Sequence, residues 1–242
     1  MAAQKDWFIS WFDTSYYHIL YQNRDDTEAQ LFMKQITSFL KLPQHTHILD
    51  LACGKGRHSV FLNSLGYKVS GVDLSENNIA SANLKRNDRL QFKVHDMRES
   101  FNEKYNAIFN LFTSFGYFKD DAIDLKVLKN IKLGLYQEGI AVIDFLNVAA
   151  VVNDLIPYEL KSIEGIDFHI RKKIENGFII KEISFEDKGE QHHYEEKVKY
   201  LDIHKFKTYF RKSGFEIQHI FGDYDLSPFH KETSKRLIFV VS

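Results

Sequence analysis

The 242-residue sequence is poor in cysteine and carries almost no excess charge. Its single cysteine, Cys53, cannot form an internal disulfide, so nothing in the composition requires an oxidising compartment. The 32 basic and 33 acidic side chains leave a formal net charge of −1. A protein held to nucleic acid mainly through phosphate contacts normally carries a basic excess. We therefore expect no nucleic-acid partner.

Long apolar runs are also missing. No run approaches the roughly 18 residues that a membrane-spanning helix needs. The N-terminal stretch MAAQKDWFISWFDTSYY lacks the basic flank and the apolar segment of a signal peptide. These absences predict a cytoplasmic protein with no membrane partner. Only three prolines occur, Pro43, Pro157 and Pro228, and each lies at a predicted connection.

What the sequence does contain is an alternation of apolar strands and amphipathic helices. Apolar residues at helical spacing predict helices over 26–41, 56–66, 75–86 and 121–139. Short apolar runs predict strands over 47–52, 67–74, 90–97, 105–112 and 140–147. Strands that alternate with helices in this way indicate an α/β fold with a doubly wound, mostly parallel sheet.

After residue 152 the pattern changes. Residues 162–187 contain alternating polar and apolar runs joined by the turns EG and ENG, which predicts antiparallel strands. A helix is then predicted at 202–214, with strands at 215–223 and 236–242. The domain organisation that we predict is one domain formed by 1–152 and 201–242, interrupted by a small antiparallel β insertion at 153–200.

A glycine-rich loop follows the first predicted strand, in the stretch ILDLACGKGRHS. Its spacing is G-x-G-x-x-S, with Ser59 where a dinucleotide-binding fingerprint has its third glycine. Glycine in such a turn lets the backbone approach a ligand closely. Asp73 ends the next predicted strand, where an acid can accept hydrogen bonds from ribose hydroxyls. Together these features predict a nucleoside-binding site.

The position of Asp50 indicates which kind of nucleoside binds at this site. It lies at the end of the first strand, shortly before Gly54 and Gly56. A negative charge there disfavours a pyrophosphate and favours a cationic ligand such as S-adenosylmethionine, which has a sulfonium and an ammonium but no phosphate. An NAD-dependent oxidoreductase on the same type of sheet is the alternative. Asp50 and the missing third glycine both count against it.

The stretch ILDLACGKGRHSVFLNSLGYKVSGVDLSENNIASA resembles the class I S-adenosylmethionine-dependent methyltransferases. In that family a D-x-x-x-G-x-G loop follows the first strand and an acid ends the second. The resemblance covers roughly residues 44–147 and implies a seven-stranded, Rossmann-like methyltransferase fold. It also implies a set of cofactor contacts: Asp50, Ala52, Gly54 and Gly56 around the methionine moiety, with Asp73 and Leu74 beside the ribose.

Three further positions follow from the same resemblance. Asp96, in the stretch VHDMRE, would accept a hydrogen bond from the adenine amino group. The backbone N–H of Met97 would serve a ring nitrogen. Asn110, at the end of the fourth predicted strand, would close the site near the transferable methyl group.

The N-terminal stretch YYHILYQNRDDTEA resembles a segment that covers the cofactor in a bacterial small-molecule subgroup of the family. The resemblance makes Tyr17, Tyr21 and Arg24 candidate contacts, with Arg24 able to pair with the methionine carboxylate. Packing for the two tyrosines, and an ion pair with Asp25 or Asp26 for the arginine, are the alternatives.

Other reactive side chains have weaker patterns. Tyr117, in FTSFGYF, is our one catalytic candidate, although His169 and Tyr194 could equally orient or deprotonate an acceptor. His192 and His193 are adjacent, so in a strand they point to opposite faces, and we predict no metal site. Packing beside glycine is the simpler explanation for Cys53, as is a structural role for His58.

The reaction implied by the resemblance is an in-line displacement that moves a methyl group to an acceptor and leaves S-adenosylhomocysteine. We expect a small-molecule acceptor, with the 153–200 insertion as its lid, and a protein or ribosomal RNA acceptor is the alternative. Enzymes that methylate base amino groups typically carry an (Asn/Asp)-Pro-Pro-aromatic stretch after the fourth strand, whereas this chain has NLFT. A non-catalytic S-adenosylmethionine-binding protein is the alternative within the same fold.

Overall fold

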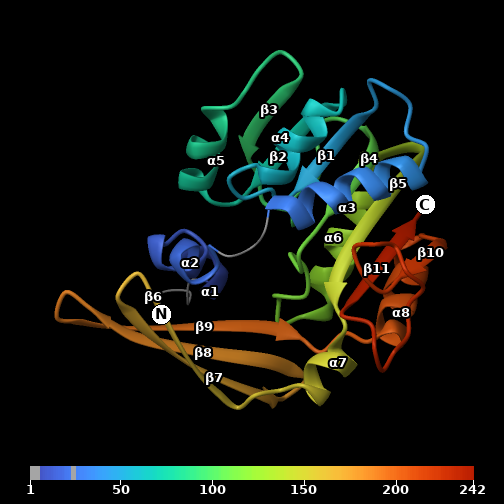
Figure 1. Cartoon of the computed structure of the whole chain (residues 1–242). Helices are drawn as coiled ribbons and strands as arrows, with labels where there is room; N and C mark the ends of the chain where they lie inside the picture. Colours follow the sequence, from blue (N-terminus) through green and yellow to red (C-terminus); the bar gives the residue numbers. More distant parts are fainter. Residues whose placement is uncertain (1–5, 23–25) are drawn as a thin grey trace.

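The structure is a computed structural model that describes residues 6–22 and 26–242. Two β-sheets organise it, one of seven strands and one of four. Figure 1 shows helices flanking the larger sheet, the four-stranded sheet set apart from it, and two short N-terminal helices between them. No helix among the described residues is long and apolar enough to span a membrane.

In the seven-stranded sheet six strands run in the same direction, and one strand, second from one edge, runs antiparallel to its two neighbours. In spatial order its strands are β10 (Ile217–Phe221), β11 (Arg236–Val241), β5 (Leu135–Leu146), β4 (Tyr105–Asn110), β1 (His47–Leu51), β2 (Lys68–Asp73) and β3 (Leu90–Val94). The chain reverses its direction of winding between β1 and β4. In open sheets of this type, ligands bind beyond the carboxyl ends of the strands at such a point.

Helices cover both faces of this sheet. They are α3 (Asp26–Phe39), α4 (Arg57–Ser64), α5 (Glu76–Asn83), α6 (Asp121–Gly134), α7 (Val148–Asn153) and α8 (Ile203–Ser213). Neighbouring residues of β4 point to opposite faces: Ile108 packs in the cluster that contains α6 and α8, and Phe109 in the cluster that contains α3, α4 and α5. Both side chains are fully buried, so β4 lies at the centre of the core.

One predicted boundary is wrong by five residues. The helix predicted to end at Gly139 ends at Gly134, and β5 begins at Leu135, whose backbone is already extended. Gly134 packs so closely that a Cβ there would lie 2.7 Å from the ring of Phe101. The helix ends there because Leu135 pairs with Tyr105 of β4, a contact between distant segments that the local apolar spacing does not reveal.

The four-stranded sheet is antiparallel throughout. Its strands are β6 (Tyr158–Ile163), β7 (Ile166–Glu175), β8 (Phe178–Asp187) and β9 (Glu190–Lys199), and all lie within the predicted insertion. Tight turns join them at 164–165, 176–177 and 188–189, where both residues have positive φ. That geometry is typical of two-residue hairpin turns and explains the Gly in second position of each turn.

Helices α1 (Trp7–Trp11) and α2 (Ser15–Leu20) connect the two sheets. Trp11 and Leu20 are buried against the apolar face of the four-stranded sheet, beside Phe168 and Phe185. On the other side, Asp13 accepts a hydrogen bond from Asn77 of α5 (2.8 Å). The N-terminal helices therefore lie as a layer between the sheets, over the carboxyl edge of the larger one (Figure 1).

Candidate functional site

A cavity of about 1080 Å³ lies at the carboxyl edge of the seven-stranded sheet. Its walls come from three parts of the chain: the loops after β1 to β5, helices α1 and α2, and strand β9. His95, Asp96 and Met97 line one end, after β3, while Leu146 and Arg236 line the other, at β5 and β11. The cavity therefore extends across the β1–β4 switch point.

The glycine loop has the backbone conformation that its sequence predicts. Ala52, Gly54 and Gly56 all have positive φ, between 56° and 78°. A Cβ on Gly54 would meet nothing within 4 Å, and this residue lines the cavity. At Gly56 a Cβ would lie 2.6 Å from the ring of Phe92, so packing against β3 requires that glycine, and Gly56 is not among the cavity-lining residues.

The Asp73 carboxylate lies at the end of β2 and holds the glycine loop. It accepts hydrogen bonds from the backbone N–H of Gly54 (2.8 Å) and of Ser75 (2.9 Å). Burial raises the pKa of Asp73 in spite of these bonds. The Gly54 amide, which a dinucleotide site would aim at a phosphate, is directed at a carboxylate instead. This arrangement suits a nucleoside without phosphates.

Asp50 is nearly inaccessible to solvent and lines the base of the cavity. Ser59 Oγ donates to its carboxylate at 2.5 Å. Burial raises the pKa of Asp50 to about 6, with the Ser59 hydrogen bond acting in the opposite direction. Ser59, which the sequence shows only as a departure from a glycine pattern, is thus the polar partner of Asp50.

Asp96 and Met97 line the far end of the cavity, as their place after β3 predicts. Arg98 holds the Asp96 carboxylate through Nε (2.9 and 3.0 Å) and reaches Asp6 at 2.9 Å through Nη1. Burial would raise the pKa of Asp96, but the hydrogen bonds from Arg98 outweigh it and keep the pKa below its ordinary value. Arg98, which sequence reasoning did not identify, ties this loop to the N-terminal segment.

Asn110 lies behind the cavity wall. Its side chain is fully buried and is not part of the lining. The amide group donates to the carbonyls of Leu51 (3.1 Å) and Ser114 (3.3 Å), so it joins the loops after β1 and β4. The residues that form the wall at this point are Leu111, Phe112, Thr113 and Ser114.

The predicted N-terminal contacts lie in the roof of the cavity, which is the side formed by α1, α2 and β9. Tyr17 and Tyr21 line the cavity with their rings 4.9 Å apart, and the Tyr21 hydroxyl donates to Glu196 of β9 (2.6 Å). Phe12 lies 4.9 Å from Tyr17. Arg24 lies outside the described residues. Of the three candidates for orienting an acceptor, Tyr117 lines the cavity, whereas His169 and Tyr194 do not.

Several lining residues escaped sequence reasoning because their positions depend on packing between distant segments. They are Trp7, Phe12, Asp13, His18, Thr113, Glu196, Tyr224 and Arg236. The closely spaced aromatics of WFISWF are the one local signal that could have identified part of the roof. Glu196 and Arg236 carry no such signal, because neither the polar strand β9 nor the apolar strand β11 marks them out from their neighbours in the sequence.

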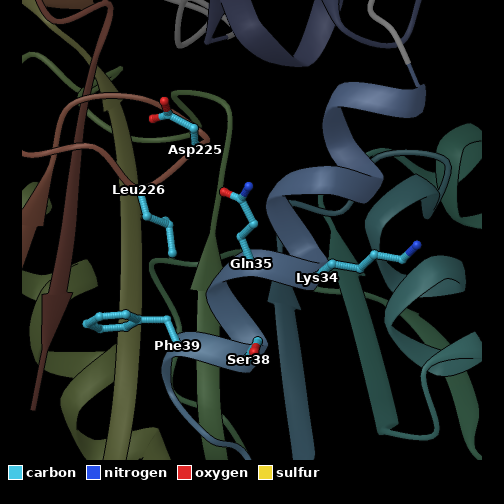
Figure 2. Close-up of a pocket in the computed structure, with 6 residues that line it drawn as sticks. All are labelled: Lys34, Gln35, Ser38, Phe39, Asp225 and Leu226. Atoms are coloured by element: carbon cyan, nitrogen blue, oxygen red, sulfur yellow. The ribbon is translucent and has the colours of Figure 1, made fainter.

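A second, more open depression of about 520 Å³ lies between α3 and the loop after β10 (Figure 2). It is lined by Lys34, Gln35, Ser38, Phe39, Asp225 and Leu226. Gln35 points toward that loop, where its amide nitrogen can donate to the Tyr224 carbonyl at 2.7 Å. This depression is therefore explained by the packing of α3 against the loop that carries Tyr224.

Comparison with known proteins agrees with this geometry. Residues 48–139 match the model of the methyltransferase domain family. The Bacillus subtilis protein YqeM, which is named as a methyltransferase, is 27% identical over 214 residues, covering 82% of this chain and 84% of that protein. This chain is a methyltransferase, with its methyltransferase domain at residues 48–139. TehB of Haemophilus influenzae, named as a probable S-adenosylmethionine-dependent methyltransferase, is 32% identical over 117 residues, covering 47% of this chain and 39% of that protein, and its named cofactor agrees with the phosphate-free site described above.

Solved structures share the fold of this methyltransferase. An S-adenosylmethionine-dependent methyltransferase from Clostridium acetobutylicum superposes with a TM-score of 0.80 at 18% identity, covering 94% of this chain and 95% of that one. The sugar N-methyltransferase KedS8 from a Streptoalloteichus species superposes with a TM-score of 0.69 at 20% identity, covering 93% and 92%. Both likenesses extend over the four-stranded sheet, so the methyltransferase fold here includes it.

Proposed function

We propose that this methyltransferase transfers a methyl group to a small-molecule acceptor bound in the cavity beside the cofactor. The observation that carries the proposal is the extent of the cavity across the β1–β4 switch point. Its volume of about 1080 Å³ exceeds the roughly 300–1,000 Å³ typical of a site for one drug-sized ligand. The cavity thus has room for a nucleoside over β1 to β3 and an acceptor over β4, β5 and β11.

The residues over β1 to β3 suit the cofactor. In this proposal the free lone pairs of the Asp73 carboxylate accept from the ribose hydroxyls, with Leu74 beside them. Asp96 and the backbone of Met97 recognise adenine. Asp50 and the loop through Ala52, Gly54 and Gly56 surround the cationic methionine end, where the negative charge of Asp50 stabilises a sulfonium or ammonium. Tyr17 and Tyr21 cover this end.

When bound, S-adenosylmethionine supplies a methyl group on a positively charged sulfur, which an acceptor lone pair can displace in line. The chain's own contribution is alignment and exclusion of water. The aromatic roof serves the second purpose: the rings of Trp7 and Phe12 lie 5.2 Å apart, and those of Trp7 and Tyr117 lie 5.1 Å apart. Tyr117 is held in place because its hydroxyl donates to the Thr113 carbonyl.

The roof also supports a small acceptor. Helices α1 and α2 and strand β9 close the cavity on the side away from the sheet, which disfavours a macromolecular acceptor. The structural neighbour KedS8 is a sugar N-methyltransferase, and its likeness extends over the same lid sheet. A non-catalytic cofactor-binding protein would not need the second half of the cavity.

Calorimetric titration with S-adenosylmethionine, S-adenosylhomocysteine and NAD tests the cofactor half of the proposal. We expect micromolar binding of the first two and none of the third. A screen of amines, amino sugars and hydroxylated small molecules, with release of S-adenosylhomocysteine as the readout, tests the acceptor half. Cofactor binding without turnover on any acceptor class would favour the non-catalytic alternative.

A further inference from the structure

Arg236 lies at the end of the cavity away from the glycine loop. It is the first residue of β11 and pairs with Leu146 at the end of β5. Because β11 runs antiparallel to β5, its first residue lies at the same edge of the sheet as the carboxyl ends of the parallel strands. Arg236 thus lines the half of the cavity that the proposed function gives to the acceptor.

A buried carboxylate holds the guanidinium of Arg236 from behind. Nε and Nη2 each lie 2.8 Å from Oδ1 of Asp144, whose side chain is fully inaccessible to solvent, whereas 18% of the Arg236 side chain is exposed. The other oxygen of Asp144 accepts from the backbone N–H of Phe112 (2.8 Å) and from the Tyr224 hydroxyl (3.2 Å). Every strong contact of Asp144 therefore fixes the wall of the cavity.

The remaining donors of this group are turned away from Asp144. Nη2 also donates to Thr113 Oγ1 at 3.0 Å, while Nη1 makes no hydrogen bond to the described part of the chain. Since the Thr113 hydroxyl accepts from Arg236, its own hydrogen stays available for a ligand. Arg236 and Thr113 both line the cavity, so they present neighbouring donors to it.

The loop that carries Thr113 is strained. Phe112 and Thr113 have φ of 55° and 65°, and a left-handed conformation is a genuine outlier for a β-branched residue. Such backbone strain is usually retained only where the surrounding structure maintains it, and it tends to occur at functional sites. Asp144 maintains it, because its carboxylate accepts from Phe112 and its backbone carbonyl accepts from Thr113 N–H (3.0 Å).

We infer that Arg236 and Thr113 bind an oxyanion of the methyl acceptor, so that the substrate is a small molecule with a carboxylate or phosphate group. The inference rests on the proposed function, because it assumes that this half of the cavity holds the acceptor. A buried ion pair alone is a poor way to join two strands, since apolar residues often do so at least as well. Here Asp144 holds one edge of the planar guanidinium, so the remaining N–H donors of Arg236 can bind an oxyanion.

The test uses full-length protein saturated with S-adenosylhomocysteine and labelled with ¹⁵N. Sodium acetate and inorganic phosphate are titrated separately at constant ionic strength, with sodium chloride as the control, and the Nε–Hε resonance of Arg236 is followed. Arg236→Lys identifies that resonance by its loss. We expect a saturable shift with one of the two oxyanions and none with chloride, and the anion that binds distinguishes a carboxylate from a phosphate substrate.

Variants separate binding from a purely structural role. Thr113→Val keeps the Arg236–Asp144 pair but removes one donor, and we expect it to weaken oxyanion binding at least fivefold. Arg236→Lys keeps a positive charge near Asp144 but loses the planar guanidinium. We expect it to weaken oxyanion binding at least tenfold, as measured by calorimetric titration with the oxyanion. Affinity for S-adenosylhomocysteine should change less than twofold in both variants.

Three outcomes would overturn the inference: no saturable shift with either oxyanion, an equal shift with chloride, or unchanged oxyanion affinity in both variants. Failure of the proposed function gives a different result. In that case the wild-type protein either does not bind S-adenosylhomocysteine, or binds it and turns over no acceptor in the screen. A protein that turns over an acceptor but binds neither oxyanion retains the proposed function and loses only the assignment of Arg236 and Thr113.

Discussion

At the residue scale, the cavity contains carboxylates in very different environments. Asp50 is buried with one hydroxyl partner, Asp73 accepts from two backbone amides, and Asp96 is held by an arginine. The pKa is raised at the first two and lowered at the third. Their similar appearance in the sequence therefore conceals different responses to pH and to ligands.

Replacing Asp73 with alanine should weaken cofactor binding. The change removes the predicted acceptor of the ribose hydroxyls and frees the Gly54 amide, so we expect a loss on the order of 2–4 kcal/mol. Calorimetric titration with S-adenosylhomocysteine measures it. Asp88→Ala, at an exposed acid outside the cavity lining, is the matched control. Equal affinity in Asp73→Ala and wild type would exclude the ribose assignment.

Asp50 should make cofactor binding depend on pH. Its pKa of about 6 lies above the ordinary 3.8 because burial disfavours the charged form. A cation bound beside it favours that form, so binding releases a proton when the pH is below about 6. We expect affinity for S-adenosylmethionine to rise roughly tenfold between pH 5 and pH 7, measured by calorimetry in two buffers of different ionisation enthalpy.

The raised pKa of Asp50 also makes the stability of the protein fall as the pH rises. Folding favours protonated Asp50, so this group's contribution to the free energy of unfolding is fully present below about pH 4 and falls as the pH rises through 6. Asp50→Asn should remove the contribution of this group to the pH dependence of stability and flatten the rise of cofactor affinity between pH 5 and pH 7. Ser59→Ala should shift the midpoint to higher pH, because it removes the hydrogen bond that favours the charged form. A pH profile that is the same in all three proteins would contradict the assignment.

At the element scale, α1, α2 and β9 form the roof through a shared acid. Glu196 accepts from Trp11 Nε1 at 2.8 Å and from the Tyr21 hydroxyl at 2.6 Å. Trp11 is fully buried, so loss of its acceptor leaves an unsatisfied polar group in the core. Pairing between a short N-terminal helix and a late strand cannot be inferred from either segment alone.

Glu196→Ala should loosen this roof. We expect the free energy of unfolding to fall by about 1–3 kcal/mol, the typical cost of a buried donor without a partner. Amide hydrogen exchange in α1 and α2 should accelerate relative to α6. Glu190→Ala, at an exposed acid that begins the same strand, serves as the control and should leave both measurements unchanged. Unaltered exchange in Glu196→Ala would show that apolar packing alone holds the helices.

At the scale of the whole molecule, a buried ion pair joins the four-stranded sheet to the larger domain. Lys199, the last residue of β9, contacts Asp124 of α6 and also Asp121 (2.8 Å). Asp124 is fully inaccessible to solvent, and burial raises its pKa to about 6 against the opposing effect of Lys199. The backbone N–H of Lys199 donates to Gly116 in the loop after β4 (2.8 Å), which adds a second link.

Lys199→Met should destabilise the protein strongly, because it leaves Asp124 buried without its cation. Removal of one partner of a buried pair typically costs about 3–5 kcal/mol. The double variant Lys199→Met/Asp124→Leu should recover at least half of that loss. Urea unfolding at pH 7 measures both. If the double variant is less stable than Lys199→Met, the unpaired charge of Asp124 is not the cause of the loss. The ion pair itself then stabilises the protein.

Local patterns in the sequence were enough to predict the larger sheet and the glycine loop and strand end that line the cavity. The strand–loop–helix pattern around Gly54 and the acid at Asp73 are properties of short segments, because the turn conformation and the strand end are determined locally. Hairpin turns after β6 and β7 were recognised for the same reason. The end of α6 was not, since the strand that follows it begins where Leu135 pairs with Tyr105 of the distant strand β4.

The tertiary structure alone decided what completes the cavity. Glu196 and Arg236 lie more than 140 residues from the glycine loop in sequence, and only strand pairing and the docking of α1 and α2 bring them to it. Side-chain direction there depends on register, and a shift of one residue would turn each side chain to the opposite face. The sequence by itself determined the fold class and the glycine-loop motif, because both depend on short local segments, whereas the end of the cavity at Arg236 exists only once distant segments pack together.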